Sequence, residues 1–182
     1  MKIIETAIKD LYVIEPNVFG DSRGHFLESF NLEKFEAAIG RVNFVQDNES
    51  CSQKGVLRGL HFQRPPFEQA KLVRVIKGRV LDVAVDLRKD SPTYGEHVAT
   101  ELSGENKKQF FVPRGFAHGF IVLEDDTIFS YKVDNKYAPD HEGGIMWNDP
   151  SLKINWELGA TEPLLSEKDK TLDQFETFKS PF

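Results

Sequence analysis

The chain has 182 residues, of which 40% are hydrophobic and 29% are charged, and its formal net charge is -6. The length suits one domain over residues 1–182, and the acidic balance argues against a nucleic-acid partner, which requires a basic surface. The single cysteine, Cys51, excludes an internal disulfide and a cysteine-based zinc site. Because no signal-peptide core or membrane-length apolar run occurs, we expect a cytoplasmic protein without membrane contact.

The N-terminal part predicts short strands, a turn-rich loop and one helix. Strands are expected over residues 3–6, 11–14 and 26–30, with the loop at 19–24. The helix is expected over residues 31–40, since Asn31 can cap its start and Gly40 can end it. Apolar residues between them recur at helical spacing, so we expect a short peripheral helix.

Strands then follow one another with turn signals between them. They are expected over residues 44–46, 49–52, 56–62, 70–77, 79–86, 97–102, 107–112, 118–123 and 127–133. Compact hairpin turns are expected at 77–79 and 124–126. Many strands, sharp turns and few helices predict an all-β fold, a sandwich or barrel of the jelly-roll kind with short peripheral helices.

The C-terminal part has a different character. Residues 137–156 are rich in Pro, Gly, Asp and Trp and predict an ordered but irregular loop. Ser166 and Asp169 then resemble a helix capping box and predict a second helical stretch through Phe175. On spacing alone, Asp169 would be a structural residue.

The segment 55–63 combines an apolar strand pattern with an imidazole and a guanidinium. Alternation places Val56, Leu60 and Phe62 on one side and Leu57, His61 and Gln63 on the other. Arg58 falls on the side of Val56, and glycines in the segment allow other groups to approach its backbone closely. A histidine in this setting is more often a hydrogen-bonded core residue than a catalyst.

Several polar residues nevertheless suggest acid–base chemistry. His61 could remove a proton near neutral pH, and Tyr131 could deliver one from the other side of a substrate. Lys71 and Arg58 could hold an oxyanion or a phosphate. The alternative is structural: Tyr131 could be a strand aromatic with its hydroxyl in water, and the two cations could be solvated at the surface.

A metal site is the other chemistry to consider. A jelly roll with His61 on one strand and His118 in the later segment 113–118 resembles the cupin barrel, whose interior often holds a metal. Cupin sites usually take two histidines from a His-x-His pair, but here the pair reads His61-Phe62-Gln63. Glu68 could supply a carboxylate, yet glutamine is a poor ligand, so we expect no metal.

Ordered motifs along the chain carry a specific resemblance. They are Phe19-Gly20-Asp21-x-Arg23-Gly24-x-Phe26-x-Glu28, Gln46-Asp47-Asn48, Leu57-Arg58-Gly59-Leu60-His61-Phe62-Gln63, Lys71-Leu72-Val73, Pro113-x-Gly115-Phe116-Ala117-His118-Gly119-Phe120, Tyr131-Lys132, Tyr137-x-Pro139-x-x-Glu142-x-Gly144-Ile145-x-Trp147-Asn148-Asp149-Pro150 and Leu165-Ser166-x-Lys168-Asp169. Over nearly its whole length the chain resembles the dTDP-4-dehydrorhamnose 3,5-epimerase family, which are cupin-type sugar-nucleotide epimerases. The implied fold is a cupin barrel, or double-stranded β-helix.

The resemblance implies an isomerase that needs no metal or other cofactor. Its substrate would be dTDP-4-dehydro-6-deoxyglucose, converted to dTDP-4-dehydro-rhamnose by inversion of C3 and C5 on the way to a cell-surface polysaccharide such as O-antigen. Carried over, His61 is the base, Asp169 orients it, and Tyr131 protonates the opposite face. Lys71 stabilises the enolate oxygen, and His118 contributes to the same pocket.

Further positions match substrate contacts of the family. These are Arg23, Phe26, Glu28, Gln46, Asn48, Arg58, Glu142 and Lys168, together with Tyr137, which would stack on the thymine base. The resemblance also implies a homodimer in which the segment Arg23–Glu28 enters the site of the other subunit.

Three rival functions remain open at this point. A mono-epimerase acting at C3 or C5 alone, or a ketoisomerase, would carry much the same residues. A non-catalytic sugar-nucleotide-binding cupin would be expected to lose His61 or Asp169, both of which are present. A metal-dependent oxygenase is opposed by Gln63.

Overall fold

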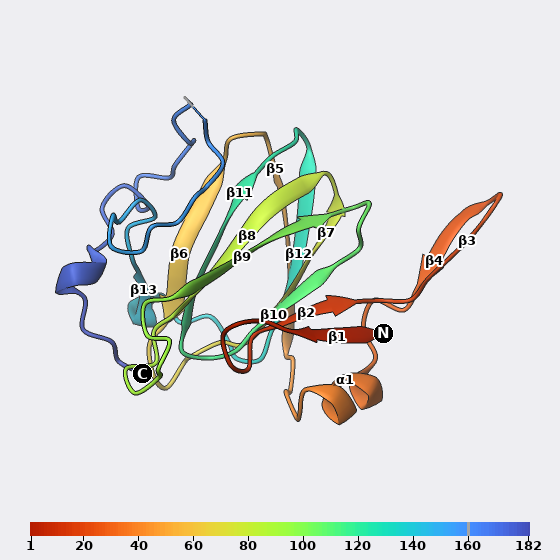
Figure 1. Cartoon of the computed structure of the whole chain (residues 1–182), viewed down its shortest axis with the longest axis horizontal. Coiled ribbons are helices and arrows are strands. Elements are labelled where there is room, and N and C mark those ends of the chain that lie inside the picture. Colours follow the sequence, from red (N-terminus) through yellow and green to blue (C-terminus); the bar gives the residue numbers. More distant parts are fainter. Residues whose placement is uncertain (160) are drawn as a thin grey trace.

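Two facing β-sheets make up most of the computed structural model, which describes residues 1–159 and 161–182 (Figure 1). One sheet has six strands in the spatial order β1 (Lys2–Glu5), β2 (Tyr12–Glu15), β10 (Gln109–Val112), β7 (Lys71–Lys77), β12 (Thr127–Val133) and β5 (Gln46–Ser52). The other has five, in the order β13 (Glu142–Gly144), β6 (Leu57–Gln63), β11 (Phe116–Val122), β8 (Arg79–Asp86) and β9 (His97–Ser103). Paired strands run antiparallel throughout both sheets.

The main core lies between the two sheets. The six-stranded sheet contributes buried residues such as Val73 and Phe129, and the five-stranded sheet contributes Val80, Ala84 and Phe120. Along β8, alternate residues therefore point inward, and those between them pack on the outer face of the same sheet. The prediction of an all-β jelly-roll, or cupin, barrel with short helices is confirmed.

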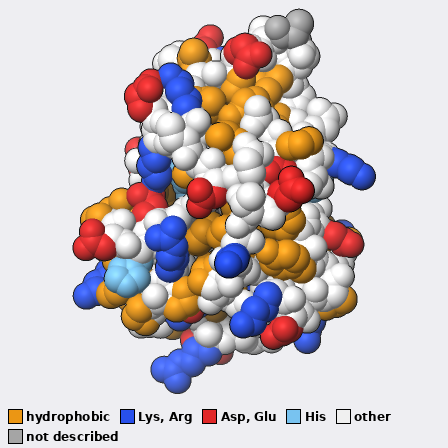
Figure 2. Space-filling model, turned by 90° about the vertical axis from the view of Figure 1, so that its left-hand side faces the viewer, with side chains coloured by type: hydrophobic (Ala, Val, Ile, Leu, Met, Phe, Trp, Pro, Cys, Tyr) orange, Lys and Arg blue, Asp and Glu red, His pale blue; other side chains and the backbone are white. Residues whose placement is uncertain are grey.

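Each sheet is covered on its outer face by a further apolar cluster. The helix α1 (Leu32–Ala38) places Phe35 against the six-stranded sheet, and the Asn31 side chain caps it by accepting a hydrogen bond from the Lys34 backbone N–H at 3.1 Å. The C-terminal segment covers the five-stranded sheet with residues that include Trp156 and Ile145. Figure 2 views this side, where hydrophobic side chains reach the surface among separate charged ones.

A hairpin projects from the body of the molecule (Figure 1). It consists of β3 (Val18–Asp21) and β4 (Gly24–Leu27), which pair only with each other. The predicted loop over 19–24 and strand over 26–30 are therefore wrong in detail, because the turn is confined to two residues. Phe19 and Phe26 are 64% and 69% exposed, respectively, which is unusual for aromatic side chains.

The predicted second helix from Ser166 is wrong. Non-helical backbone bonds lie on either side of Ser166 instead. The Leu57 N–H on β6 donates to the Leu164 carbonyl at 3.0 Å, and the Met146 N–H, just after β13, donates to the Asp173 carbonyl at 2.8 Å. Ser166 and Asp169 do form the mutual hydrogen bonds of a cap, but around a turn.

Two short helices, η1 (Pro139–His141) and η2 (Phe175–Thr177), occur in the C-terminal part. Elsewhere, the two strands predicted over 44–46 and 49–52 are replaced by the single strand β5.

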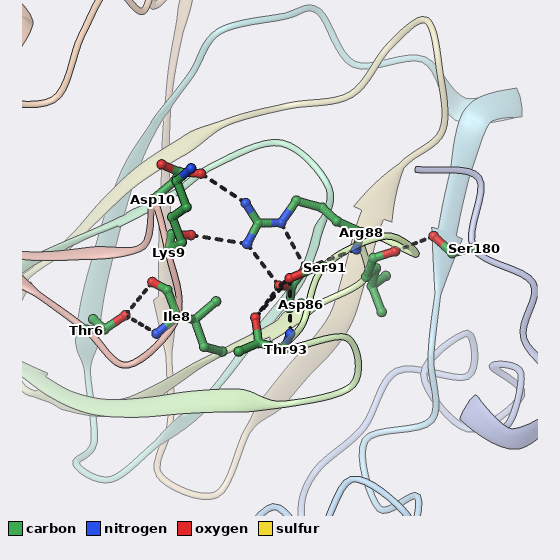
Figure 3. Close-up of polar contacts among 10 residues, drawn as sticks. Thr6, Ile8, Lys9, Asp10, Asp86, Arg88, Ser91, Thr93 and Ser180 are labelled. Carbon is green, nitrogen blue, oxygen red and sulfur yellow. Dashed lines mark hydrogen bonds and ion pairs between the residues drawn. The ribbon is translucent and has the colours of Figure 1, made fainter.

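A buried ion-pair network fastens the end of β8 (Figure 3). The fully buried Asp86 carboxylate accepts hydrogen bonds from Arg88 Nε and Nη2, both at 2.9 Å, from Ser91 at 2.6 Å and from Thr93 at 2.7 Å. Arg88 also donates to Asp10 at 3.1 Å and so links β8 to the N-terminal segment. This carboxylate is fully satisfied, which identifies a structural role.

We expect Asp86→Asn to lower the free energy of unfolding by about 3 kcal/mol, because it leaves Arg88 without its buried partner. Burial acts to raise the pKa of Asp86, but the hydrogen bonds from Arg88, Ser91 and Thr93 outweigh it and lower the pKa. The carboxylate therefore stabilises the fold fully above the ordinary pKa of about 3.9 and loses this effect as the pH falls through the lower folded value. Urea unfolding between pH 3 and 7 measures both effects, with the exposed Asp90→Asn as control; equal midpoints for the two variants would contradict the assignment.

Candidate active site

The strand β6 reaches the barrel interior with a break in its alternation. Its pairing with β11 shifts register between the pairs His61–His118 and Arg58–Phe120. At this break Gly59 has φ +131°, and a Cβ there would lie 2.5 Å from the Gly119 Cα. The break turns Arg58 and His61 to the same side, so the prediction that they face opposite sides is wrong. Leu57, predicted to share the face of His61, instead packs in the outer cluster.

A pocket of about 150 Å³ opens between the two sheets, and the predicted catalytic residues meet there. Its lining includes Arg58, His61 and His118 from the five-stranded sheet, and Lys71 and Tyr131 from the six-stranded sheet. Groups that donate, accept or carry positive charge therefore face one another across this pocket. Such convergence of polar groups is typical of a small-molecule site.

His61 is paired with a buried carboxylate. Its Nε2 lies 2.5 Å from Asp169 Oδ1, and the Asp169 side chain is 4% exposed. Burial acts to raise the pKa of Asp169, but the hydrogen bond and charge of His61 and the Ser166 hydroxyl outweigh it, so the pKa lies below its ordinary value. The carboxylate thus stays ionised and can orient the imidazole and stabilise its protonated form.

A second histidine–carboxylate pair lies beside the first, and sequence reasoning missed its carboxylate. His118 Nε2 lies 2.8 Å from Asp82 Oδ1, and both residues are buried. Asp82 shares the inward face of β8 with Val80 and Ala84. A carboxylate that interrupts the apolar run from Val80 to Val85 at an inward position was the signal that could have found it.

The two residues from the six-stranded sheet have shifted pKa values. Burial lowers the pKa of the Lys71 ammonium to about 8, although Asp82 and Glu142 act to raise it. Burial raises the pKa of the Tyr131 phenol, with Arg58 acting to lower it and Glu142 to raise it. At neutral pH, Lys71 can therefore carry positive charge, and Tyr131 keeps a proton that it can donate.

Another group of predicted residues lies near His61 and Asp169 but outside the pocket lining. The Tyr137 hydroxyl donates to Glu142 Oε2 at 3.0 Å, and Lys168 forms an ion pair with Glu142 Oε1. Glu142 lies opposite Gln63 in the pairing of β13 with β6, and Lys168 precedes the partner of His61. The Tyr137 ring is exposed and free to stack on a flat ligand.

Gln63, which stands where a cupin metal ligand would be, holds this neighbouring loop. Its buried side-chain oxygen accepts a hydrogen bond from the Ala138 backbone N–H at 2.9 Å. Within residues 1–159 and 161–182, no three His, Cys, Asp or Glu side chains are grouped so that they could hold a metal ion. Gln63 therefore holds the loop next to Tyr137 in place.

The remaining predicted residues also lie outside the pocket lining. Gln46 and Asn48 are on β5, where Gln46 Nε2 donates to Asn48 Oδ1 at 2.7 Å and Asn48 pairs with Tyr131. Arg23, Phe26 and Glu28 lie on or directly after the projecting hairpin, and the structure does not bring them to the pocket of their own chain.

The contacts of the hairpin residues are local. Arg23 pairs with Asp21 at 2.5 Å, and Glu28 pairs with Lys34 at 2.6 Å.

Across the described parts of the chain, no helix has the length and apolar character needed to cross a membrane.

Comparison with known proteins shows the family of the chain. The family model of dTDP-4-dehydrorhamnose 3,5-epimerase matches residues 5–177. The dTDP-4-dehydrorhamnose 3,5-epimerase of Shigella flexneri is 56% identical over 170 residues, which are 93% of each chain. The dTDP-6-deoxy-D-glucose-3,5-epimerase of Legionella pneumophila, solved in complex with dTDP-4-keto-L-rhamnose, is 49% identical with a TM-score of 0.94 and covers 98% of this chain and 94% of its own.

A more distant solved structure is the 3'-monoepimerase of Streptomyces bikiniensis in complex with dTDP-quinovose. It is 34% identical, has a TM-score of 0.89, and covers 94% of this chain and 87% of its own. The family model and the identity to the Shigella protein extend over nearly the whole chain. The protein is therefore an enzyme that belongs to the dTDP-4-dehydrorhamnose 3,5-epimerase family.

Proposed function

We propose that the enzyme converts dTDP-4-dehydro-6-deoxy-D-glucose into dTDP-4-dehydro-L-rhamnose by inverting C3 and C5 of the sugar, without a metal or other cofactor. The observation that carries this proposal is the placement of His61 and Tyr131 on facing sheets of one pocket. A base on one side and an acid on the other are what inversion at a carbon requires, because the proton must leave one face and return to the other.

The chemistry follows from the C4 ketone, which makes the protons on C3 and C5 acidic. His61 removes such a proton, and the electrons of the broken C–H bond move to the C4 oxygen to form an enolate. The Lys71 ammonium, which lines the same pocket, supports the negative oxygen. Tyr131 then protonates the carbon from the opposite face. To complete the cycle, His61 releases the proton that it took to solvent, and Tyr131 regains a proton from solvent.

The nucleotide part of the substrate would lie towards the group formed by Tyr137, Glu142 and Lys168. The exposed Tyr137 ring offers a stacking surface for thymine, and Arg58 and Lys168 offer positive charge to the pyrophosphate. The Legionella relative was solved with a dTDP-sugar, which supports this class of ligand. An acidic protein can bind such an anion because the cations are gathered locally.

We also infer that the enzyme works as a homodimer in which the projecting hairpin enters the site of the second subunit. The hairpin is unpaired with the two main sheets, and its Phe19 and Phe26 are largely exposed. A second copy of the chain would bury these rings and bring Arg23 and Glu28 to a nucleotide. This arrangement gives a function to predicted residues that lie away from the pocket of their own chain.

The experiment that tests the proposed function is NMR of dTDP-4-dehydro-6-deoxyglucose incubated with the enzyme in heavy water. We expect deuterium at both C3 and C5 and a product with both centres inverted. Deuterium at only one carbon would show a mono-epimerase, the activity named for the Streptomyces relative. Binding of the substrate with no deuterium at either carbon would leave a sugar-nucleotide-binding protein.

A further inference from the structure

The carboxylate of Asp169 has two oxygens, and the proposed mechanism uses only one of them. Oδ1 lies 2.5 Å from His61 Nε2. Oδ2 accepts a hydrogen bond from the Ser166 hydroxyl at 2.8 Å, and the Asp169 backbone N–H donates to the Ser166 oxygen at 3.2 Å. Because the carboxylate is buried, leaving Oδ2 without a partner would be costly. Ser166 therefore satisfies the oxygen that His61 leaves unpaired.

The turn that carries this pair is anchored on both sides. Leu164 is hydrogen-bonded to β6 at 3.0 Å, and Asp173 is hydrogen-bonded to the chain just after β13 at 2.8 Å. Between these anchors, Leu172 lies against β13, where a Cβ on Gly144 would meet its Cδ2 at 2.7 Å. Gly144 pairs with His61 across the two strands. These contacts hold the backbone of the turn beside the base, but they leave the orienting carboxylate free to rotate about its side-chain bonds.

The group that limits this rotation is the Ser166 hydroxyl. Among the described residues, the hydrogen bonds of the Asp169 carboxylate run to His61 and to Ser166. The neighbouring cation does not take the place of the hydroxyl, because the Lys168 ammonium forms an ion pair with Glu142 Oε1. A carboxylate held at both oxygens presents Oδ1 to the imidazole in one orientation, as a precisely placed catalytic group requires.

We propose that Ser166 is a positioning residue of the reaction, which holds Oδ2 of Asp169 by its hydroxyl. Oδ1 is then fixed towards the Nε2–H of His61, and Nδ1 is the nitrogen left to take the sugar proton. The inference deepens the proposed function and rests on it, because it concerns the nitrogen that acts as the base. Ser166 does not line the pocket, so it acts only through Asp169 and His61.

The first test needs no substrate and examines the neutral imidazole of His61 directly. With ¹⁵N-labelled histidine, NMR distinguishes the form that carries its proton on Nε2 from the form that carries it on Nδ1, and His61→Ala identifies the His61 signals by their loss. We expect the Nε2–H form in the native protein and a mixture of both forms in Ser166→Ala. The signals of His118, whose Nε2 lies 2.8 Å from Asp82 Oδ1, are an internal reference that should not move. An unchanged His61 pattern in the folded variant would overturn the inference, as would Nδ1–H as the main native form.

The second test compares a hydroxyl with a methyl group at the same position. Ser166 is exposed, so a larger side chain has room there. Ser166→Thr keeps the hydroxyl, whereas Ser166→Val has a methyl group in its place. We expect Ser166→Val and Ser166→Ala to lower kcat by on the order of 10-fold with KM little changed, since misplacing a reacting group by about 1 Å can cost about 100-fold. Ser166→Thr should have the native imidazole form and nearly the native kcat. A threonine variant as slow as the valine variant would contradict the inference.

Ser151→Ala is the matched control. The Ser151 hydroxyl likewise donates to a buried carboxylate, that of Asp149, and neither residue lines the pocket. Its loss should leave the His61 signals and kcat at their native values. Equal losses of kcat in Ser151→Ala and Ser166→Ala would show a general weakening of the C-terminal part and would also overturn the inference.

The two measurements separate this inference from the proposed function. If the His61 ring changes its form in Ser166→Ala while the native enzyme does not exchange sugar protons, the hold of Ser166 on the pair stands and the epimerase mechanism fails. If the native enzyme exchanges both protons and Ser166→Ala matches it in ring form and in kcat, the mechanism stands and the role of Ser166 fails.

Discussion

Replacement of His61 by alanine is expected to lower kcat by on the order of 10⁴-fold, the upper range for loss of a general base. The imidazole, whose Nε2 lies 2.5 Å from Asp169 Oδ1, is the proposed base, and the substitution removes it. Deuterium exchange at C3 and C5 should disappear together with turnover. Binding of dTDP should be nearly unchanged, because the residues proposed to hold the nucleotide do not include His61. NMR in heavy water measures the first two quantities, and calorimetry measures the third.

The control for this variant is His97→Ala. His97 lies on β9 and does not line the pocket, so its loss should leave exchange at the native rate. Exchange by His61→Ala at a rate close to that of His97→Ala would remove His61 from the role of base.

The same variant tests whether the hairpin enters the other subunit. His61→Ala and Arg23→Ala subunits are each expected to be impaired alone, the first in its pocket and the second in the pocket of its partner. Mixed under conditions that exchange subunits, they should recover about a quarter of the native activity, since random pairing places one complete site in about half of the dimers. Recovery would be absent if Arg23 served the pocket of its own chain.

Replacement of Tyr131 by phenylalanine is expected to lower inversion by about 100-fold or more while proton exchange continues. The substitution removes only the hydroxyl, and the ring keeps its packing on Phe129 at a centroid distance of 6.0 Å. His61 can still form the enolate and return a proton to the face from which it came. The ratio of inverted product to deuterium-labelled substrate, followed by NMR, therefore separates the acid from the base.

Tyr12→Phe is the matched control for this variant. Tyr12 stacks on Phe111 at the outer face of the six-stranded sheet, with a centroid distance of 6.4 Å, so loss of its hydroxyl should change neither ratio nor rate. Equal losses of inversion and exchange in Tyr131→Phe would show that the hydroxyl takes part in enolate formation and not in protonation alone.

Local pattern was sufficient for most of the barrel. The predicted strands Arg79–Asp86 and Thr127–Val133 match β8 and β12 at both ends, because apolar alternation is bounded by strong turn signals. The helix after Asn31 was predicted for the same kind of reason, since its cap and its apolar spacing act within a few residues. The catalytic assignments of His61, Tyr131 and Asp169 depended instead on ordered motifs, since spacing alone made Asp169 a cap and His61 a core residue.

Contacts between distant segments decided what local pattern could not. The register shift beside Gly59 depends on the close approach of Gly119. Because of this shift, the side chains of Arg58 and His61 both point into the same pocket. The segment around Ser166 carries a helix-start pattern, yet the backbone on either side of it is bonded to Leu57 on β6 and to Met146, both distant in the sequence.

Identity and order of residues therefore determined the strands, the first helix and the family. Only the tertiary structure decided which side of β6 meets the pocket and which carboxylate pairs with each histidine. The physical reason is that strand periodicity is a local property, whereas a bulge, a buried hydrogen bond such as Asp82–His118 and a shared electrostatic field exist only once separate strands are packed together.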